Sequence, residues 1–108
     1  MIVSYDTTAL QQACYVLEQA EQQYGAVHAQ ALIALIADVE AFDNGAELID
    51  FWNDDLFITN DDSLLLPVGA DYRATLTAVG SRYQRDADGR VVWYSVTRLK
   101  LLAITRCR

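Results

Sequence analysis

Apolar residues recur at helical spacing over the first part of the chain and at a spacing of two further on. Residues 2–5 alternate weakly, which predicts a short strand. Apolar positions three and four apart then predict one helix over about residues 7–24, ended by Gly25, which adopts the left-handed geometry of a helix end without strain. A second, wider stripe predicts a helix over 26–42 that is buried on more than one side. Residues 46–52 are expected to add one or two helical turns.

The change to a period of two after residue 52 predicts a sheet. The expected strands are 56–59, 64–68, 71–79 and, after a loop over 80–89, residues 90–96 and 97–106 as two strands or as one bent strand. Pro67 cannot donate a ladder hydrogen bond, so it marks a sheet edge or a strand end. The predicted fold class is α+β: an N-terminal strand, a two-helix hairpin and a three- to four-stranded antiparallel sheet. No repeat or linker interrupts the chain, so residues 1–108 are expected to form a single domain.

Charge is distributed very unevenly along the chain. All 8 basic residues lie at or after position 73, and only Asp86 and Asp88 of the 15 acidic residues lie there. Residues 1–72 therefore carry a formal charge of −13 and residues 73–108 one of +6, which gives −7 overall. The net negative charge argues against nonspecific binding of anions by the whole surface, but the basic segment 73–108 could bind an anionic partner.

Strand alternation sorts the basic residues by face. Arg73 is expected to point away from the apolar side of its strand, and Arg98, Lys100, Arg106 and Arg108 are expected to share one face of the last strand. If the helices cover the apolar side, the other side is a cationic platform for an anionic partner. An alternative of about equal weight is that these charges only solvate the sheet or pair with the acidic helices.

The sequence predicts a cytoplasmic location. No run reaches the roughly 18–20 apolar residues of a membrane helix, and the N-terminus lacks the charge and cleavage site of a signal peptide. Cys14 and Cys107 are expected to be reduced thiols, since neither belongs to a metal-binding or redox motif. No membrane contact, metal or other cofactor is predicted.

The common catalytic motifs are absent, including phosphate-binding glycine loops and the zinc-protease helix motif. His28, the single histidine, is expected to have no catalytic role. The acidic residues Asp54, Asp55, Asp61 and Asp62 lack the spacing of a calcium loop, so a solvated loop is expected there.

The order of elements, with several short segments, resembles the RelE/ParE superfamily of bacterial toxin–antitoxin systems, most closely its HigB-like killer proteins. The similar segments are Val3-Ser4-Tyr5-Asp6, Tyr24-Gly25-Ala26, Asn44-Gly45-Ala46-Glu47-Leu48, Asp71-Tyr72-Arg73 and Asp88-Gly89-Arg90-Val91-Val92-Trp93. They cover nearly the whole chain, and their order and spacing carry the resemblance.

The resemblance implies a toxin that stops growth, by cleaving mRNA in the ribosomal A site or, in the ParE branch, by poisoning gyrase. The implied partners are a cognate antitoxin protein and, for an mRNA endoribonuclease, the ribosome and mRNA, with a homodimer as a further state. Arg73 matches the family's mid-sheet arginine, and with Arg106 it would stabilise charge on the phosphate as a catalytic residue. Arg98, Lys100 and Arg108 would bind nucleic acid.

Two departures from the family pattern keep other functions open. Phe51-Trp52-Asn53-Asp54-Asp55 stands where relatives carry a basic loop, and Cys107-Arg108 where they end in tyrosine or histidine. No general acid or base is evident near the sheet, which favours a different target or a degenerate copy. A second class of function is a non-enzymatic acidic inhibitor, such as an immunity, antitoxin or anti-defence protein, that blocks a basic nuclease with helix carboxylates. A third is an RNA- or small-molecule-binding scaffold.

Overall fold

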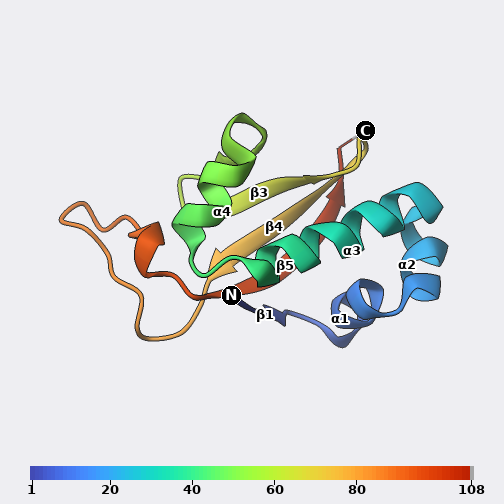
Figure 1. Cartoon of the computed structure of the whole chain (residues 1–108), viewed down its shortest axis with the longest axis horizontal. Coiled ribbons are helices and arrows are strands. Elements are labelled where there is room, and N and C mark those ends of the chain that lie inside the picture. Colours follow the sequence, from blue (N-terminus) through green and yellow to red (C-terminus); the bar gives the residue numbers. More distant parts are fainter. Residues whose placement is uncertain (108) are drawn as a thin grey trace.

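The computed structural model describes residues 1–107 and places four α-helices and a five-stranded sheet in one α+β fold (Figure 1). The helices are α1 Thr8–Tyr15, α2 Leu17–Tyr24, α3 Ala26–Ala41 and α4 Gly45–Trp52, and single 3₁₀ turns are η1 Asn53–Asp55 and η2 Trp93–Ser95. The strands are β1 Ile2–Tyr5, β2 Phe57–Ile58, β3 Ser63–Val68, β4 Tyr72–Ala78 and β5 Arg98–Arg106. The predicted α+β class is therefore confirmed.

The sheet has the order β1-β5-β4-β3-β2 and is mixed. β1 pairs with β5 in parallel, with Ile2 opposite Arg98, whereas every other neighbouring pair is antiparallel. The prediction of a three- to four-stranded antiparallel sheet is wrong in this respect, because the first strand joins the sheet as a fifth, parallel edge. Parallel neighbours need a long crossover, and here the intervening chain supplies the helices and the other strands.

The first predicted helix is two helices. Thr7 caps α1 by accepting a hydrogen bond from Leu10 N, at 3.1 Å. Val16 then has extended torsion angles, φ −111° and ψ 105°, and separates α1 from α2. A β-branched residue is a weak helix former, and the break turns Leu17 outward, so that it is 42% exposed instead of lying on the predicted buried stripe.

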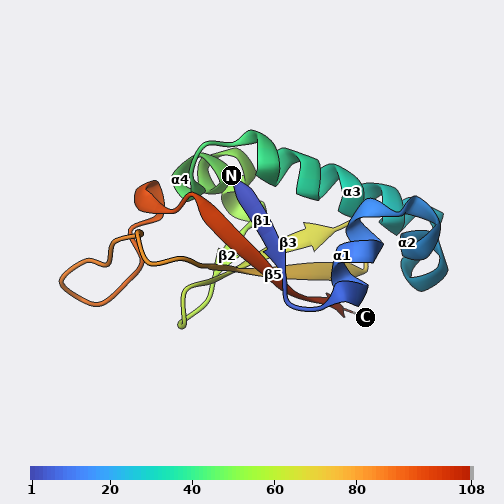
Figure 2. The same cartoon turned by 90° about the horizontal axis from the view of Figure 1, so that it is seen from below.

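The core lies between α3, α4 and one side of the sheet, and Figure 2 shows these two helices together on that side. α3 begins after Gly25 as predicted and ends at Ala41. Asn44 caps α4 by accepting a hydrogen bond from Glu47 N. The largest fully buried side chains come from α3, α4, the strands β3, β4 and β5, and Val96: Leu32, Leu35, Leu48, Leu64, Leu66, Leu76, Leu99, Leu101, Val39, Val68 and Val96. Pro67 lies on a sheet edge, as predicted, because β2 pairs only with Leu64 and Leu65.

Residues 79–97 form a long loop that projects beyond the sheet at the end opposite α1 and α2 (Figure 1). The strand predicted over 90–96 is therefore wrong: this segment contains one isolated bridge, Arg85 with Val91, and the turn η2. The C-terminal part of the loop is fixed to another part of the chain. Gly45 N donates to Val96 O at 2.9 Å, and Val91 and Val96 are buried.

Candidate nucleic-acid interface

The side of the sheet away from α3 and α4, here called the open face, is not covered by these helices (Figure 2). Two neighbouring strands, β4 and β5, contribute cations to it. In β4, Arg73, Thr75 and Thr77 alternate with buried residues and so lie on the open face, as predicted. Thr77 pairs with Lys100 of β5, and paired residues share a face, so Lys100 and Arg98 lie there too. Three of the predicted site residues therefore lie on the same face of the sheet, with Arg73 at one end of β4 and Arg98 and Lys100 towards the other.

Arg106 does not share this face, because β5 contains a bulge. Thr75 pairs with Ala103 and the next residue, Leu76, pairs with Leu101, so Leu102 is an extra residue without a partner in β4. One extra residue reverses the alternation of the strand beyond it. Arg106 therefore lies on the helix side, with its guanidinium 5.9 Å from the centre of the Tyr72 ring. The prediction that it faces the same way as Arg98 and Lys100 is wrong; its catalytic role stays a prediction.

The cations of the open face differ in their partners. Lys100 Nζ lies 3.4 Å from Asp6 Oδ1 and forms an ion pair with it. The Arg73 guanidinium lies 5.9 Å from the centre of the Phe57 ring, which is 57% exposed. Within residues 1–107 neither Arg73 nor Arg98 makes an ion pair. These two arginines are the open-face charges left for a partner, while Arg108 lies outside the described residues.

A hollow of about 370 Å³ adjoins Arg98 at the end of the open face. Its walls are residues 79–83 and 95–98, and it is lined by Val79, Gly80, Ser81, Arg82, Tyr83, Ser95, Thr97 and Arg98. Hydrogen bonds join the two wall segments at both ends of the hollow. Val79 N donates to Arg98 O at 3.2 Å, and Gln84 N donates to Ser95 Oγ at 2.7 Å. The hollow is therefore a gap in the β4–β5 pairing with fixed ends.

The loop that forms this hollow is attached to the β2–β3 turn through Asp62. Its carboxylate is 6% exposed and accepts hydrogen bonds from Arg90 Nε at 2.8 Å and from Val91 N at 3.1 Å. The hydrogen bond from Arg90 is the main reason that the pKa of Asp62 lies below its ordinary value. The expectation of a solvated acidic loop thus fails at this residue, since a buried carboxylate needs such a cation and donors.

Sequence reasoning missed a cluster at the opposite end of the sheet. His28, near the start of α3, has its Nε2 atom 3.6 Å from Asp71 Oδ2, and its ring contacts the Tyr72 ring at 5.1 Å between centres. The Arg106 guanidinium also lies near the Tyr72 ring, 5.9 Å from its centre. An imidazole beside a carboxylate and a guanidinium contains the groups that acid–base chemistry needs, but it lies on the helix side, away from Arg73. No sequence motif links these residues.

Buried ionisable side chains gather where β1 and the first helices meet. Burial, with Glu40 nearby, raises the pKa of the Cys14 thiol to about 12. Burial also raises the pKa of Tyr5 and of Tyr24 above the ordinary phenol value. These groups are kept neutral at physiological pH, so they belong to the packing of this region and add no charge to the open face.

Comparison of the chain with family models, curated proteins and solved structures found no match in any of the three. Among residues 1–107 no helix is long and apolar enough to cross a membrane. In the same part of the chain no group of three or more His, Cys, Asp or Glu side chains is arranged to hold a metal ion. The site must therefore be interpreted from its own geometry.

Proposed function

We propose that this chain is a RelE/ParE-like, toxin-like component that binds single-stranded RNA on its open face without cleaving it. The observation that carries the proposal is the pair of arginines, Arg73 and Arg98, that lie on one uncovered sheet surface without an ionic partner within residues 1–107. Unpaired guanidiniums on an uncovered sheet surface are free to contact the phosphates of a nucleic acid.

The arrangement of the open face suits a single strand of nucleic acid. Val79, which is hydrogen-bonded to Arg98, lies six residues after Arg73. At the usual rise of a strand, Arg73 and Arg98 are therefore about 20 Å apart along the sheet. Phe57, with Arg73 beside it, offers a surface on which a base can stack. Sheets that bind RNA combine such aromatic rings with arginines that contact phosphates.

Binding without cleavage follows from what this face lacks. The β4 and β5 residues assigned to it are arginine, lysine, threonine and alanine, none of which is a general base at neutral pH, and the neighbouring Asp6 carboxylate is ion-paired with Lys100. The imidazole of His28 lies beside Asp71 on the other side of the sheet. This supports the degenerate-toxin alternative over an active ribonuclease.

The test is induced expression in a bacterial host combined with RNA crosslinking and mapping of mRNA 5′ ends. We expect crosslinks that are lost in Arg73→Ala, retained in Arg85→Gln, and accompanied by no new 5′ ends. Arg85 is the matched control because its guanidinium is occupied by Gly89 O, at 2.8 Å, and by Tyr83. New cleavage sites that disappear in Arg73→Ala would instead establish a ribonuclease, and no crosslink in any variant would reject RNA binding.

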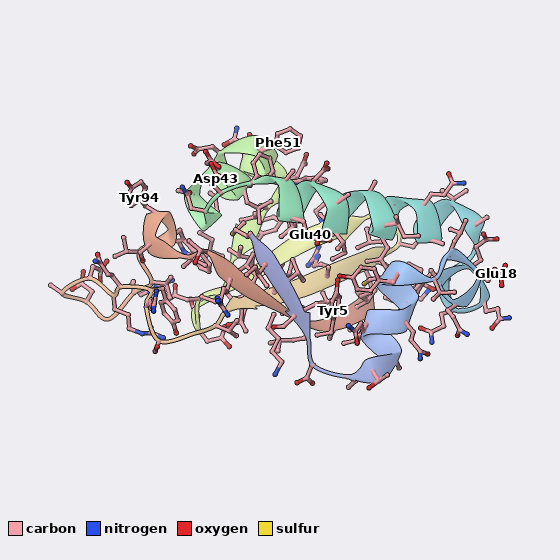
Figure 3. The ribbon with its side chains drawn as sticks, turned by 60° about the horizontal axis from the view of Figure 1, so that its bottom comes forward. Tyr5, Glu18, Glu40, Asp43, Phe51 and Tyr94 are labelled. Carbon is pink, nitrogen blue, oxygen red and sulfur yellow. The ribbon has the colours of Figure 1, made fainter. Side chains whose placement is uncertain are left out.

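The helix side supports a second candidate, an acidic protein inhibitor. Phe51 of α4 is 62% exposed and extends from the helix layer near Asp43, as Figure 3 shows. No basic residue precedes position 73, so this side would attract a cationic protein. The candidate predicts a basic binding partner whose affinity falls in Asp50→Lys and Phe51→Ala while the open-face variants bind normally.

A further inference from the structure

The hollow between residues 79–83 and 95–98 is rich in hydrogen-bond donors and contains no carboxylate among its lining residues. Its two charged side chains are Arg82 and Arg98, in a chain whose net charge is −7. Neither guanidinium has an ionic partner within the described residues, whereas Arg85 and Arg90 both approach Asp62, at 4.0 and 2.7 Å. In this loop Arg85 and Arg90 thus have an ionic partner and Arg82 has none within the described residues. Arg82 lines the hollow together with Arg98.

The backbone adds further donors. Gly80, Ser81 and Arg82 lie between the two hydrogen bonds that close the ends of the hollow. Within residues 1–107 their N–H groups donate no hydrogen bond. Gly80 has φ +98°, a conformation suited to glycine, and it turns the chain away from β5 where the pairing stops. Peptide N–H groups, hydroxyls of Ser81 and Thr97, and two guanidiniums around one small space form a site for an oxygen-rich anion.

We infer that this hollow binds a terminal phosphate, that is, the phosphomonoester of a nucleotide or of an RNA end. A phosphomonoester carries about −1.5 to −2 charges near neutral pH, which two guanidiniums can neutralise, whereas an internal phosphodiester carries one. A volume of about 370 Å³ accommodates such a group, since small-ligand sites typically measure roughly 300–1,000 Å³. The inference extends the proposed function, because Arg98 belongs to both the hollow and the open face. It rests on the proposed function only where RNA is the molecule that carries the phosphate.

Calorimetric titration of the whole protein with AMP, adenosine and inorganic phosphate tests the hollow directly. We expect AMP and phosphate to bind and adenosine not to bind. Arg82→Ala and Arg98→Ala should each weaken AMP binding by roughly tenfold or more, the usual effect of losing a charged hydrogen bond. The AMP affinity of Arg98→Lys should lie between those of the native protein and Arg98→Ala. Arg85→Gln, which removes an arginine outside the hollow, should bind AMP normally. Circular dichroism and thermal melts confirm that each variant folds.

Short RNAs that differ only in the presence of a 5′- or 3′-phosphate identify the source of the phosphate. A terminal phosphate that strengthens binding through Arg82 supports the inference. Equal binding of phosphorylated and unphosphorylated RNA, unchanged in Arg82→Ala, overturns it and leaves the open-face proposal intact. Arg82-dependent AMP binding without any RNA binding rejects the RNA proposal and retains a nucleotide site. A phosphoserine peptide that binds more tightly than AMP would overturn the nucleotide assignment.

Discussion

Asp62→Asn is expected to weaken the attachment of the long loop to the β2–β3 turn. Asp62 has φ +61°, a left-handed conformation that asparagine also tolerates, so this substitution removes charge while it keeps the shape and backbone preference. The carboxylate accepts hydrogen bonds from Arg90 Nε and Val91 N, which are 28 and 29 residues away along the chain. Asparagine can keep one of these acceptors, so the main loss is the charged contact to Arg90.

The magnitude follows from the exposure of the two partners. A hydrogen bond to a charged group contributes about 1.5–3 kcal/mol. Asp62 is buried, but the Arg90 side chain is 49% exposed, so solvent screens the pair and the lower end of that range applies. We therefore expect the free energy of unfolding to fall by about 1.5–2 kcal/mol, measured by urea denaturation at pH 7 with an unchanged slope. A loss below about 0.5 kcal/mol, typical of surface substitutions, would refute this account of the loop.

The pH dependence gives an independent check. The folded-state pKa of Asp62 is lowered, chiefly by the hydrogen bond from Arg90. Its contribution to stability is therefore present above the unfolded pKa of about 3.9 and is lost as the pH falls through the lower folded value. The stability difference between the native protein and Asp62→Asn should be constant from pH 7 to about 5 and shrink below pH 4. A difference that stays constant into strong acid would contradict the assigned charge.

Iodoacetamide at pH 8 should alkylate the exposed Cys107 and spare the native Cys14, whose pKa burial raises to about 12; equal labelling by mass spectrometry would show that Cys14 is accessible. Stability should also fall as pH rises above about 8.5, because the unfolded Cys14 thiol ionises and the buried one does not. Gly69→Ala should cost about 1–3 kcal/mol in thermal melts, because φ is +63° and a Cβ would lie 2.6 Å from His28 Cδ2; an unchanged melting temperature would exclude this strain. Arg106→Gln should weaken RNA binding less than substitutions on the open face, and equal losses would disprove the face assignment.

Local rules predicted the elements that depend on nearby residues. Gly25 ends a helix, residues 46–52 form a further short helix, and Arg73 alternates with buried neighbours in β4, all as the pattern indicates. Each of these outcomes depends on capping or on side-chain period within a few residues. The fold class and most of the open face could therefore be predicted from the sequence.

The errors concern contacts between distant segments. The bulge at Leu102 depends on how β5 pairs with β4, and nothing in strict alternation reveals it. Residues 90–96 have strand-like composition, but Asp62 and Gly45 hold them in a loop. The partner of His28 is Asp71, which lies 43 positions later. Such pairings follow from tertiary packing, which overrides local preference.

The parallel pairing of β1 with β5 has a kinetic consequence. β1 leaves a ribosome first of the five strands, yet its only neighbour in the sheet is the last strand in chain order. At about 5–20 residues per second, roughly 5–20 s pass between their synthesis. During this interval the nascent chain has β1 unpaired, and closing so long a segment slows folding. Chain elongation, rather than helix formation, is thus expected to set the earliest moment at which the cationic surface can exist.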